Sequence, residues 1–328
     1  MNSLPVKRAC ELTDHGDQPQ WLIEGLWADQ AVGILGGQPK CCKSFLALDI
    51  AVSVAAGAPC LRQFPVRRTG PVLLFPAEDA LTVVRQRLEG ICLAAGAQLD
   101  KLPIYVITAP RLLLDLPQDR EQLRATVAEI RPALLILDPF IRLHRADENA
   151  SKDVAPLLGY LRELQRQFGV AVLLVHHVRK GSSAERPGQA LRGSSDLHGW
   201  GDSNLYLRRN SRHLILSVEQ RAAPSPDDIP LHLSVNGHGP SLAVLDTPQN
   251  DPAIAGPSSP ADRILLAVSK ANGPLTAAQL RKACRIRTST LSTATADLVA
   301  AGRLRRGLDG YSLHSSPPPV PVSLSLPL

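Results

Sequence analysis

The sequence predicts an α/β protein with a mostly parallel sheet covered by helices on both faces, followed by a smaller helical domain. Between residues 21 and 246, short runs of Val, Ile and Leu alternate with stretches of helical periodicity. Strands buried on both faces give such continuous apolar runs, and their alternation with helices is typical of parallel sheets. Aromatic residues make up only 4% of the chain, which agrees with a core of aliphatic side chains.

The expected elements follow this pattern in order. Continuous apolar runs predict strands at residues 31–35, 71–75, 104–108, 133–137 and 170–175. Helical periodicity predicts helices at residues 44–56, 120–130 and 154–168. After Trp200 the pattern changes to alternating runs at residues 203–207, 213–218 and 230–234, which indicate an antiparallel extension of the sheet.

Composition divides the chain into five segments. A lead-in of residues 1–20 precedes the α/β domain of residues 21–246. Residues 247–260 are rich in Pro, Ser, Gly and Ala and are expected to form a linker. A small domain of residues 261–314 follows, with expected helices at 264–271, 277–284 and 288–301 and a hairpin made from 302–306 and 310–313. Residues 315–328 carry PPPVPV and no charge, and we expect them to be disordered.

Positive charge is concentrated in the small domain. Residues 261–314 contain nine Lys and Arg residues but three Asp residues, an excess equal to the formal net charge of +6 of the whole chain. A basic segment on a neutral body favours a polyanionic partner, most often nucleic acid, over the alternative of a merely solubilising surface.

Cysteine spacing and hydropathy give further expectations. The six cysteines show no CxxC spacing, which favours free thiols in a reducing compartment over structural zinc. The first 20 residues lack the apolar run of a signal peptide, and no apolar run reaches the ~18 residues of a membrane span. We therefore expect a cytoplasmic protein with no membrane partner.

Residues 36–44 read GGQPKCCKS and lie between an expected strand and an expected helix. A loop that binds phosphates needs backbone N–H groups at a helix N-terminus, a lysine that reaches the phosphate oxygens and a hydroxyl that binds Mg²⁺. Lys43 and Ser44 fit the last two roles, whereas Cys42 stands where the consensus has glycine. The candidate ATP-binding residues are Gly37, Gln38, Pro39, Lys40, Cys41, Cys42, Lys43 and Ser44.

Two further expected strands end in carboxylates. Residues 134–138 read LLILD, so Asp138 is expected at the carboxyl edge of the sheet, where with Ser44 it would hold Mg²⁺. Residues 72–79 read VLLFPAED, and Glu78 is our candidate for the base that deprotonates the attacking water. One strand that ends in an acid is commonplace, but the order phosphate loop, Glu, Asp predicts a site for ATP and Mg²⁺.

The strand expected at residues 170–175 is followed by His176 and His177. Paired histidines can bind zinc, but no third ligand has suitable spacing, so we discount a metal there. We expect His177 to contact the γ-phosphate from the sheet edge, against the alternative of a structural histidine.

These motifs together are similar to those of a known family. The GxPKxxKS form of the phosphate loop, FPAED, LLILDP and LLVHHVRK resemble RepA-type hexameric replicative helicases and, more broadly, RecA/DnaB-like P-loop ATPases. The resemblance covers residues 21–245. It implies a RecA-like core, a ring of six subunits with ATP held between neighbours, and single-stranded DNA inside the ring.

The resemblance also implies an arginine that reaches the ATP of the neighbouring subunit. Two positions match family patterns for it. Arg192 lies in LRGSSD, which is similar to the RepA-type RGxS segment, and Arg221 lies in VEQRAAP, which matches the strand-end Lys-x-Arg of DnaB-like proteins. Glu219 replaces the lysine of that pattern, and either arginine could instead be a surface residue.

The small domain resembles winged-helix domains through LTAAQL, LSTATADL and AGRL. In such domains the third helix enters the major groove of DNA and the wing contacts the backbone. The candidate DNA-binding residues are Arg285, Arg287, Arg303, Arg305 and Arg306. Winged helices also bind proteins, and the basic charge favours DNA.

Three functional hypotheses follow. The first is an ATP-dependent DNA helicase or translocase of the plasmid or phage replication type. The second is a nucleotide-switched DNA-binding ATPase, such as a loader, recombination mediator or regulator, which does not unwind DNA; the departures at Cys42 and Glu219 favour slow turnover. The third is an interaction scaffold that has lost hydrolysis.

Overall fold

The computed structural model divides into two compact units, residues 1–245 and residues 246–328. The structure describes residues 4, 6–11, 20–148, 150–177, 195–209, 213–236, 239–245, 260–269, 271, 273–284, 288–307 and 309–313.

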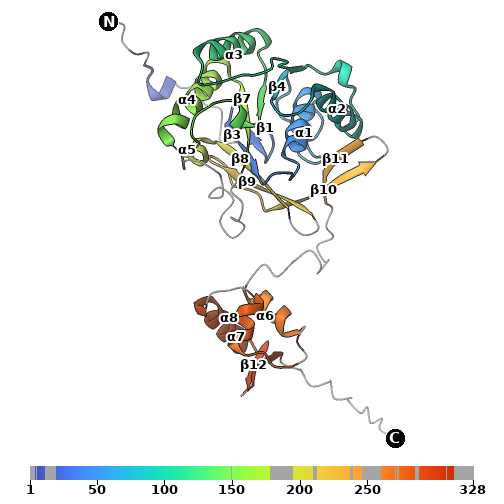
Figure 1. Ribbon diagram of the computed structural model, residues 1–328, viewed down its shortest axis with the longest axis vertical. Helices are drawn as coiled ribbons and strands as arrows, with labels where there is room; N and C mark the ends of the chain where they lie inside the picture. The colour runs from blue at the N-terminus through green and yellow to red at the C-terminus, as the bar shows by residue number, and fades with distance from the viewer. Residues whose placement is uncertain are drawn as a thin grey trace. The chain divides into compact units, whose positions relative to one another are not determined.

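The first unit is built on a large, mostly parallel sheet (Figure 1). Its nine strands within the described residues lie in the order β11-β10-β9-β8-β3-β7-β6-β4-β5. Strands β8, β3, β7, β6, β4 and β5 run parallel to one another, and β9, β10 and β11 extend the sheet in antiparallel fashion. The bounds are β3 Val32–Gly37, β4 Val72–Pro76, β5 Ile104–Val106, β6 Leu134–Asp138, β7 Ala171–His177, β8 Ser203–Arg209, β9 Leu214–Gln220, β10 Ile229–Asn236 and β11 Gly239–Val244.

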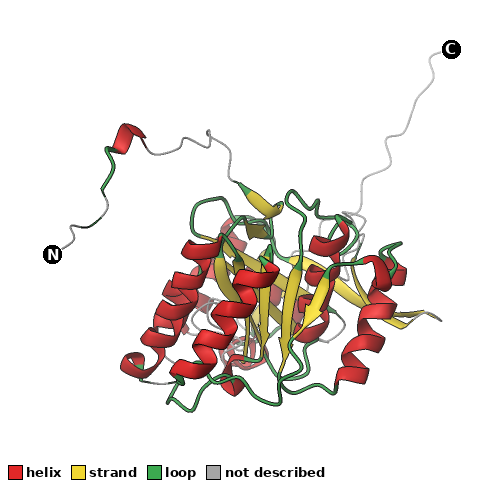
Figure 2. Cartoon of the chain, turned by 90° about the horizontal axis from the view of Figure 1, so that it is seen from above, coloured by secondary structure: helices red, strands yellow, loops and turns green. Residues whose placement is uncertain are grey.

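Helices cover both faces of this sheet (Figure 2). Alternate residues of the central strands point to opposite faces, so Leu74 joins one apolar cluster and Leu73 the other. The first cluster contains α1 (Lys43–Ala56) and α2 (Leu81–Ala94), and the second contains α3 (Pro117–Ile130) and α4 (Ser151–Phe168). Burial on both faces explains why β3, β6 and β7 are continuous apolar runs.

The parallel register brings the carboxyl ends of several strands to one edge of the sheet. Gly37 at the end of β3 pairs with His177 at the end of β7 and with Leu207 near the end of β8. Asp138 at the end of β6 pairs with Pro76 at the end of β4. The phosphate loop and both carboxylate-bearing strand ends therefore share this edge.

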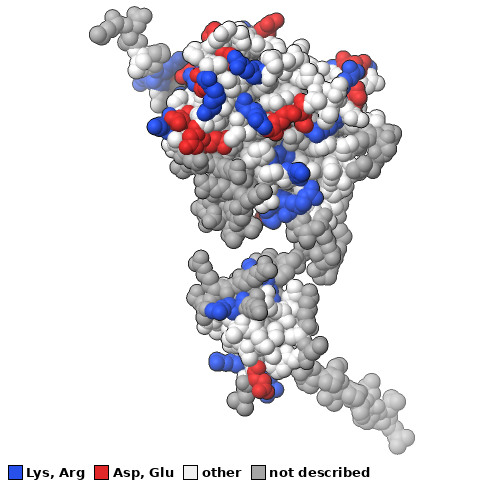
Figure 3. Space-filling view, in the orientation of Figure 1, with Lys and Arg blue, Asp and Glu red and all other residues white. Residues whose placement is uncertain are grey.

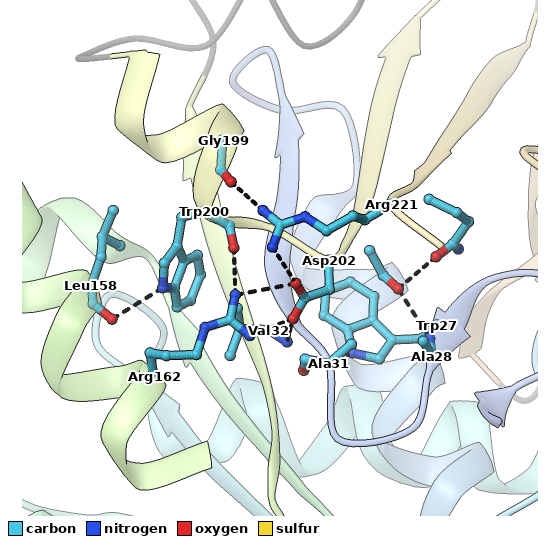
Figure 4. A network of polar contacts seen from close by, with 12 residues as sticks. Trp27, Ala28, Ala31, Val32, Leu158, Arg162, Gly199, Trp200, Asp202 and Arg221 are labelled. Atoms are coloured by element: carbon cyan, nitrogen blue, oxygen red, sulfur yellow. Dashed lines mark hydrogen bonds and ion pairs between the residues drawn. The ribbon is translucent and has the colours of Figure 1, made fainter. Parts of the chain in front are cut away.

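A polar network joins the start of β3 to the start of β8, at the edge of the sheet away from the phosphate loop (Figure 4). Arg162 of α4 and Arg221, which follows β9, both pair with the Asp202 carboxylate, the latter with Nη1–Oδ1 at 3.0 Å. The same carboxylate accepts a hydrogen bond from the Val32 amide at 3.3 Å. At Gly33 a Cβ atom would lie 1.7 Å from the Ser203 carbonyl oxygen, so only glycine allows this approach.

Short elements complete the first unit. A hairpin of β1 (Trp21–Ile23) and β2 (Trp27–Ala28) buries the Trp27 side chain completely. The remaining short helices are η1 (Ala9–Glu11), η2 (Leu99–Lys101), η3 (Phe140–Arg142) and α5 (Ser195–Trp200). Among the residues with assigned structure, no helix is both long and apolar enough to cross a membrane.

The second unit consists, as far as it is described, of three helices and a hairpin. These are α6 (Pro260–Ser269), α7 (Ala277–Cys284), α8 (Thr288–Ala300), β12 (Leu304–Gly307) and β13 (Gly310–Leu313). A small core that includes Ile264, Leu280 and Leu298 holds them together. Thr276 and Gln279 form a reciprocal capping box that begins α7, with the Thr276 amide donating to Gln279 Oε1 at 2.8 Å.

Candidate nucleotide-binding site

The phosphate loop leaves the sheet at Gly37 and enters α1 at Lys43. Two of its residues, Lys40 (φ 63°) and Cys42 (φ 68°), have left-handed backbone conformations, which favour glycine and turn the chain sharply. At Gly37 a Cβ atom would lie 2.4 Å from the Leu207 carbonyl oxygen and 2.7 Å from Cys41 Sγ. The close approach of β8 therefore requires glycine at this position.

Lys43 is folded back onto this loop. Only 5% of its surface is exposed, and its Nζ donates hydrogen bonds to the carbonyl oxygens of Gly37 at 3.0 Å and Gln38 at 2.9 Å. Desolvation lowers the pKa of Lys43, and electrostatic interactions with Cys41, Asp138 and Glu78 oppose this. The ammonium is thus held by neutral carbonyls, which an incoming phosphate can replace as a stronger, charged partner.

His177 is the third partner of this ammonium, with its Nδ1 3.2 Å from Lys43 Nζ. Desolvation lowers the pKa of His177, and the positive charges of Lys43 and His176 lower it further. An ammonium has donors only, so Nδ1 must accept and the ring proton of neutral His177 lies on Nε2. The imidazole therefore has an N–H donor available for an oxyanion.

Asp138 and Ser44 form an oxygen-rich pair at the same edge. The Ser44 hydroxyl donates a hydrogen bond to the Asp138 carboxylate. Desolvation raises the pKa of Asp138 to about 6, and the nearby carboxylates Asp79 and Glu78 add to this, whereas Ser44 and Lys43 act in the opposite direction. Hydroxyl and carboxylate oxygens are the ligands that Mg²⁺ prefers, so this donor set fits the cation, which would also relieve the repulsion among the carboxylates.

The two acids after β4 are both paired with arginines. Glu78 Oε1 accepts a hydrogen bond from Arg142 Nε at 2.7 Å, and the Glu78 side chain is 45% exposed. Asp79 pairs with Arg87 of α2, whose guanidinium lies over the Phe45 ring at 4.9 Å. In this arrangement both carboxylates at the end of β4 have a cationic partner.

These side chains surround one cavity. It has a volume of about 310 Å³ and is open to solvent. Its lining contains Lys40, Cys42, Lys43, Ser44, Phe45, Glu78, Asp79, Arg87, Asp138, Pro139 and His177. A larger cavity of about 680 Å³ lies against α2 and β5, and none of the expected site residues lines it. The structure thus brings Lys43, Ser44, Glu78, Asp138 and His177 around a single space of the size that small-molecule ligands occupy.

The remaining residues of the loop contribute differently. Gln38, Pro39 and Lys40 are exposed, whereas Cys41 is buried and its thiol donates to the Leu207 carbonyl oxygen at 3.3 Å. Cys41 therefore anchors the loop to β8.

Arg221 lies away from this cavity. Its guanidinium pairs with Asp202 and donates to the Gly199 carbonyl oxygen (Figure 4). This network lies at the start of β3, whereas the phosphate loop follows the other end of that strand, at Gly37. Glu219, which stands at the position of the expected lysine, pairs with His198 at 2.8 Å. Arg221 therefore cannot reach the cavity of its own chain from this position. Arg192, Arg285 and Arg287 lie outside the described residues.

The other expected DNA-binding residues lie on or beside the hairpin of the second unit. Arg303, Arg305 and Arg306 are all exposed, and the Arg306 guanidinium lies 6.0 Å from the centre of the Tyr311 ring. In Figure 3 the visible face of the first unit carries acidic (red) and basic (blue) side chains intermixed. On the described part of the second unit, more of the charged side chains in view are basic than acidic.

Sequence reasoning missed three arginines at the site. Arg87 and Arg142 pair with the acids after β4, and Arg209 at the end of β8 hydrogen-bonds the Cys42 thiol. Desolvation raises the pKa of that thiol, although Arg209, Arg87 and Lys43 act in the opposite direction. Their positions in the sequence could have indicated two of them. Arg142 comes four residues after Asp138, and Arg209 ends a strand that pairs with β3 next to the phosphate loop.

Comparison with known proteins gives the family and the fold of the first unit. A family model described as "AAA domain" matches residues 7–183. Among solved structures, an ATPase domain matches with a TM-score of 0.51 and 14% identity over 65% of this chain and 85% of that chain. "The Structure Of A DnaB-Like Replicative Helicase And Its Interactions With Primase" gives the same TM-score, identity and coverage of this chain, and 57% coverage of its own. At this identity the structural matches show a shared α/β fold.

Proposed function

This chain belongs to the AAA domain family, and on that premise we propose that it is a Mg²⁺-dependent ATPase that acts on DNA. One observation carries the proposal. Lys43, Ser44, Glu78, Asp138 and His177, which come from four different segments, line one cavity at the carboxyl edge of the parallel sheet. Open α/β sheets bind ligands at this edge.

Each side chain has a distinct role in the proposed reaction. Lys43 exchanges its backbone carbonyl partners for the β- and γ-phosphate oxygens. Ser44 and Asp138 hold Mg²⁺, which when bound neutralises charge on the phosphates. Glu78 takes a proton from the water whose oxygen bonds to the γ-phosphorus, while the bond from phosphorus to the bridging oxygen breaks and ADP leaves. His177 donates from Nε2 to a phosphate oxygen.

The finer proposal is a replicative DNA helicase or translocase, assembled as a ring of six subunits with ATP between neighbours. It is supported by the fold shared with an ATPase domain and with a DnaB-like replicative helicase, and by the motif resemblance. Such an assembly takes an arginine from the adjacent subunit, and Arg221 and Arg192 remain our candidates for it. Arg221 is 54% exposed, so a neighbouring molecule has access to it.

We further propose that the second unit is a winged helix that binds DNA. Its three helices, its hairpin and the exposed Arg303, Arg305 and Arg306 support this assignment. Contacts of these side chains with phosphates would give salt-sensitive binding with little sequence preference.

A second candidate function, a nucleotide-switched DNA-binding ATPase, has its own support. Cys42 adopts a left-handed conformation at a position where the phosphate-loop consensus has glycine. Glu78 is paired with Arg142, so the candidate base is engaged before nucleotide binds. Both features favour slow turnover, which suits a switch more than a motor.

The deciding experiment measures ATP hydrolysis by the full chain with and without single-stranded DNA, together with displacement of a forked duplex. DNA-stimulated hydrolysis with strand displacement supports the helicase, and stimulated hydrolysis without displacement in either polarity supports the switch. Hydrolysis no faster than in Lys43→Ala refutes both and favours a scaffold. Mass measurement with a non-hydrolysable ATP analogue tests the hexamer.

A further inference from the structure

We propose that Arg142 keeps Glu78 from accepting the proton of the attacking water until a backbone phosphate of single-stranded DNA binds the Arg142 guanidinium in place of Glu78. This inference rests on the proposed DNA-dependent ATPase and names the contact that couples the two ligands. It assigns Arg142 as a positioning residue, because its action on the reaction passes through Glu78.

The first support is the contact itself. Arg142 Nε lies 2.7 Å from Glu78 Oε1, across 64 residues of sequence. A general base must reach the water it deprotonates directly. While Arg142 occupies one carboxylate oxygen, that oxygen is not available to accept a proton from water, and the arginine sets the orientation of Glu78 within the cavity lining.

The second support is where the arginine is attached. Arg142 ends η3, which begins two residues after Asp138, so the same short segment holds the proposed Mg²⁺ ligand and the partner of the proposed base. Phe140 of η3 is completely buried and packs against His144, with ring centroids 4.5 Å apart. This anchor fixes the backbone, so a change at Arg142 is confined to its long side chain.

The third support is exposure. The Arg142 side chain is 62% exposed, and Ile141 beside it is 42% exposed, so this corner of the cavity faces outward. Exposed ion pairs are weak, and a guanidinium binds phosphate with two parallel hydrogen bonds. A polyanion at this surface therefore competes effectively with Glu78 for the arginine.

Arg145 provides a matched control. It lies three residues further along and pairs with Asp115, with Nη2–Oδ2 at 2.7 Å and 64% exposure of its side chain. Its contact closely resembles that of Arg142, but Asp115 does not line the cavity. Arg145→Ala thus removes one exposed arginine and one exposed ion pair from the same segment without touching Glu78.

The test compares steady-state ATP hydrolysis by wild type, Arg142→Ala and Arg145→Ala, each with and without oligothymidylate. We expect Arg142→Ala to raise kcat without DNA about two- to fivefold, the range that the strength of an exposed ion pair allows, with KM for ATP unchanged. Stimulation by DNA should fall by the same factor, and Arg142→Lys should restore part of it. Arg145→Ala should behave like wild type.

Several outcomes would overturn the inference. A lower kcat in Arg142→Ala would mean that the arginine supports catalysis, and a higher KM would mean that it binds the nucleotide. Unchanged stimulation of Arg142→Ala by DNA would exclude the exchange with a DNA phosphate. The same conclusion would follow if fluorescence anisotropy showed that Arg142→Ala binds oligothymidylate no more weakly than Arg145→Ala does. Loss of all hydrolysis in wild type would refute the proposed function itself, whereas normal wild-type hydrolysis with an unaltered Arg142→Ala refutes this inference alone.

Discussion

Lys43 Nζ and His177 Nδ1 lie 3.2 Å apart, so a side-chain contact joins the start of α1 to the end of β7, beside the backbone pairing of Gly37 with His177. When a phosphate binds Lys43 in place of its present partners, the hydrogen bond from Lys43 Nζ to His177 Nδ1 is lost and the imidazole can reorient. The two residues are therefore expected to respond together to nucleotide binding.

This relationship predicts the effect of removing the imidazole. His177→Ala should lower kcat for ATP hydrolysis about 10- to 100-fold, because a hydrogen bond to a charged group contributes about 1.5–3 kcal/mol. KM should change little, since Lys43 still binds the phosphates. His213→Ala, which lies outside the cavity lining, is the control; an equal decrease in both variants would argue against a role of His177 at the phosphate.

Asp138 predicts an unusual dependence of stability on pH. Its pKa is about 6 in the folded chain, against an ordinary value of 3.8. The folded state therefore binds the proton more tightly, and stability falls as pH rises from about 4 to 6, by roughly 1–3 kcal/mol. Asp138→Asn should remove this decrease, so that it is more stable than wild type at pH 7.5 but not at pH 4, as measured by urea denaturation.

Asp115 is the control for the sign of this effect. Although desolvation raises its pKa, hydrogen bonds from Arg145 and from backbone groups lower the pKa overall. A lowered pKa contributes stability above the unfolded value that is lost as pH falls, so Asp115→Asn should destabilise the chain at pH 7.5. If both variants shift stability in the same direction, the environment assigned to Asp138 is wrong.

Asp138 also predicts how pH affects the binding of Mg²⁺. A carboxyl must be ionised to bind the cation, so protons compete with Mg²⁺ below pH 6. The Mg²⁺ concentration for half-maximal ATP hydrolysis should rise towards about tenfold per pH unit below that value. A half-maximal concentration that stays constant between pH 5 and 7 would contradict this prediction.

Replacing Cys42 by glycine should both stabilise the fold and lower the KM for ATP. Glycine accepts the left-handed backbone at φ 68° without the cost of a side chain, about 1 kcal/mol. Cys42→Gly should therefore raise the free energy of unfolding by about that amount, and the KM for ATP should fall because the backbone can approach the phosphates more closely.

Arg131→Gly separates these two effects. Arg131 directly follows α3 as its C-cap, with φ 48°, and does not line the cavity, so glycine there should stabilise the chain and leave KM unchanged. A fall in KM for Arg131→Gly as well would show that general stabilisation, and not the phosphate loop, is responsible.

The hairpin arginines predict a change in the salt dependence of DNA binding. Replacing Arg303, Arg305 and Arg306 together by Ala should weaken duplex binding at all sequences. The slope of log K against log salt should become shallower by about 0.9 for each phosphate that these side chains no longer neutralise. Arg85→Ala, an exposed arginine of α2, is the control. An unaltered slope in the triple variant would exclude these residues from the interface.

The sequence predicted the framework of the α/β unit better than its contacts. Continuous apolar runs identified β3, β4, β6 and β7, because burial on both faces leaves a strong local signal. The parallel register brings together the residues that end these strands and the loop that follows β3, which is why Lys43, Asp138 and His177 could be chosen in advance. The β1–β2 hairpin was missed because strands of two or three residues carry too little periodicity.

The ion pairs of the site could not be predicted. Arg142 meets Glu78 across 64 residues, and Arg221 meets Asp202 at a sheet edge that only the antiparallel extension creates. Such pairings depend on rotamers and on the packing of distant segments, and neither leaves a pattern in the local sequence.

The Asp202 network has a practical consequence for choosing fragments. The matched family region ends at residue 183, before Asp202, yet Val32 and Arg162 inside that region both bond to its carboxylate. A protein cut there would leave β3 as an unprotected outer strand in place of a central one, with its amide and a guanidinium lacking their acceptor. The shortest piece fit for expression and crystallisation should therefore extend to about residue 245.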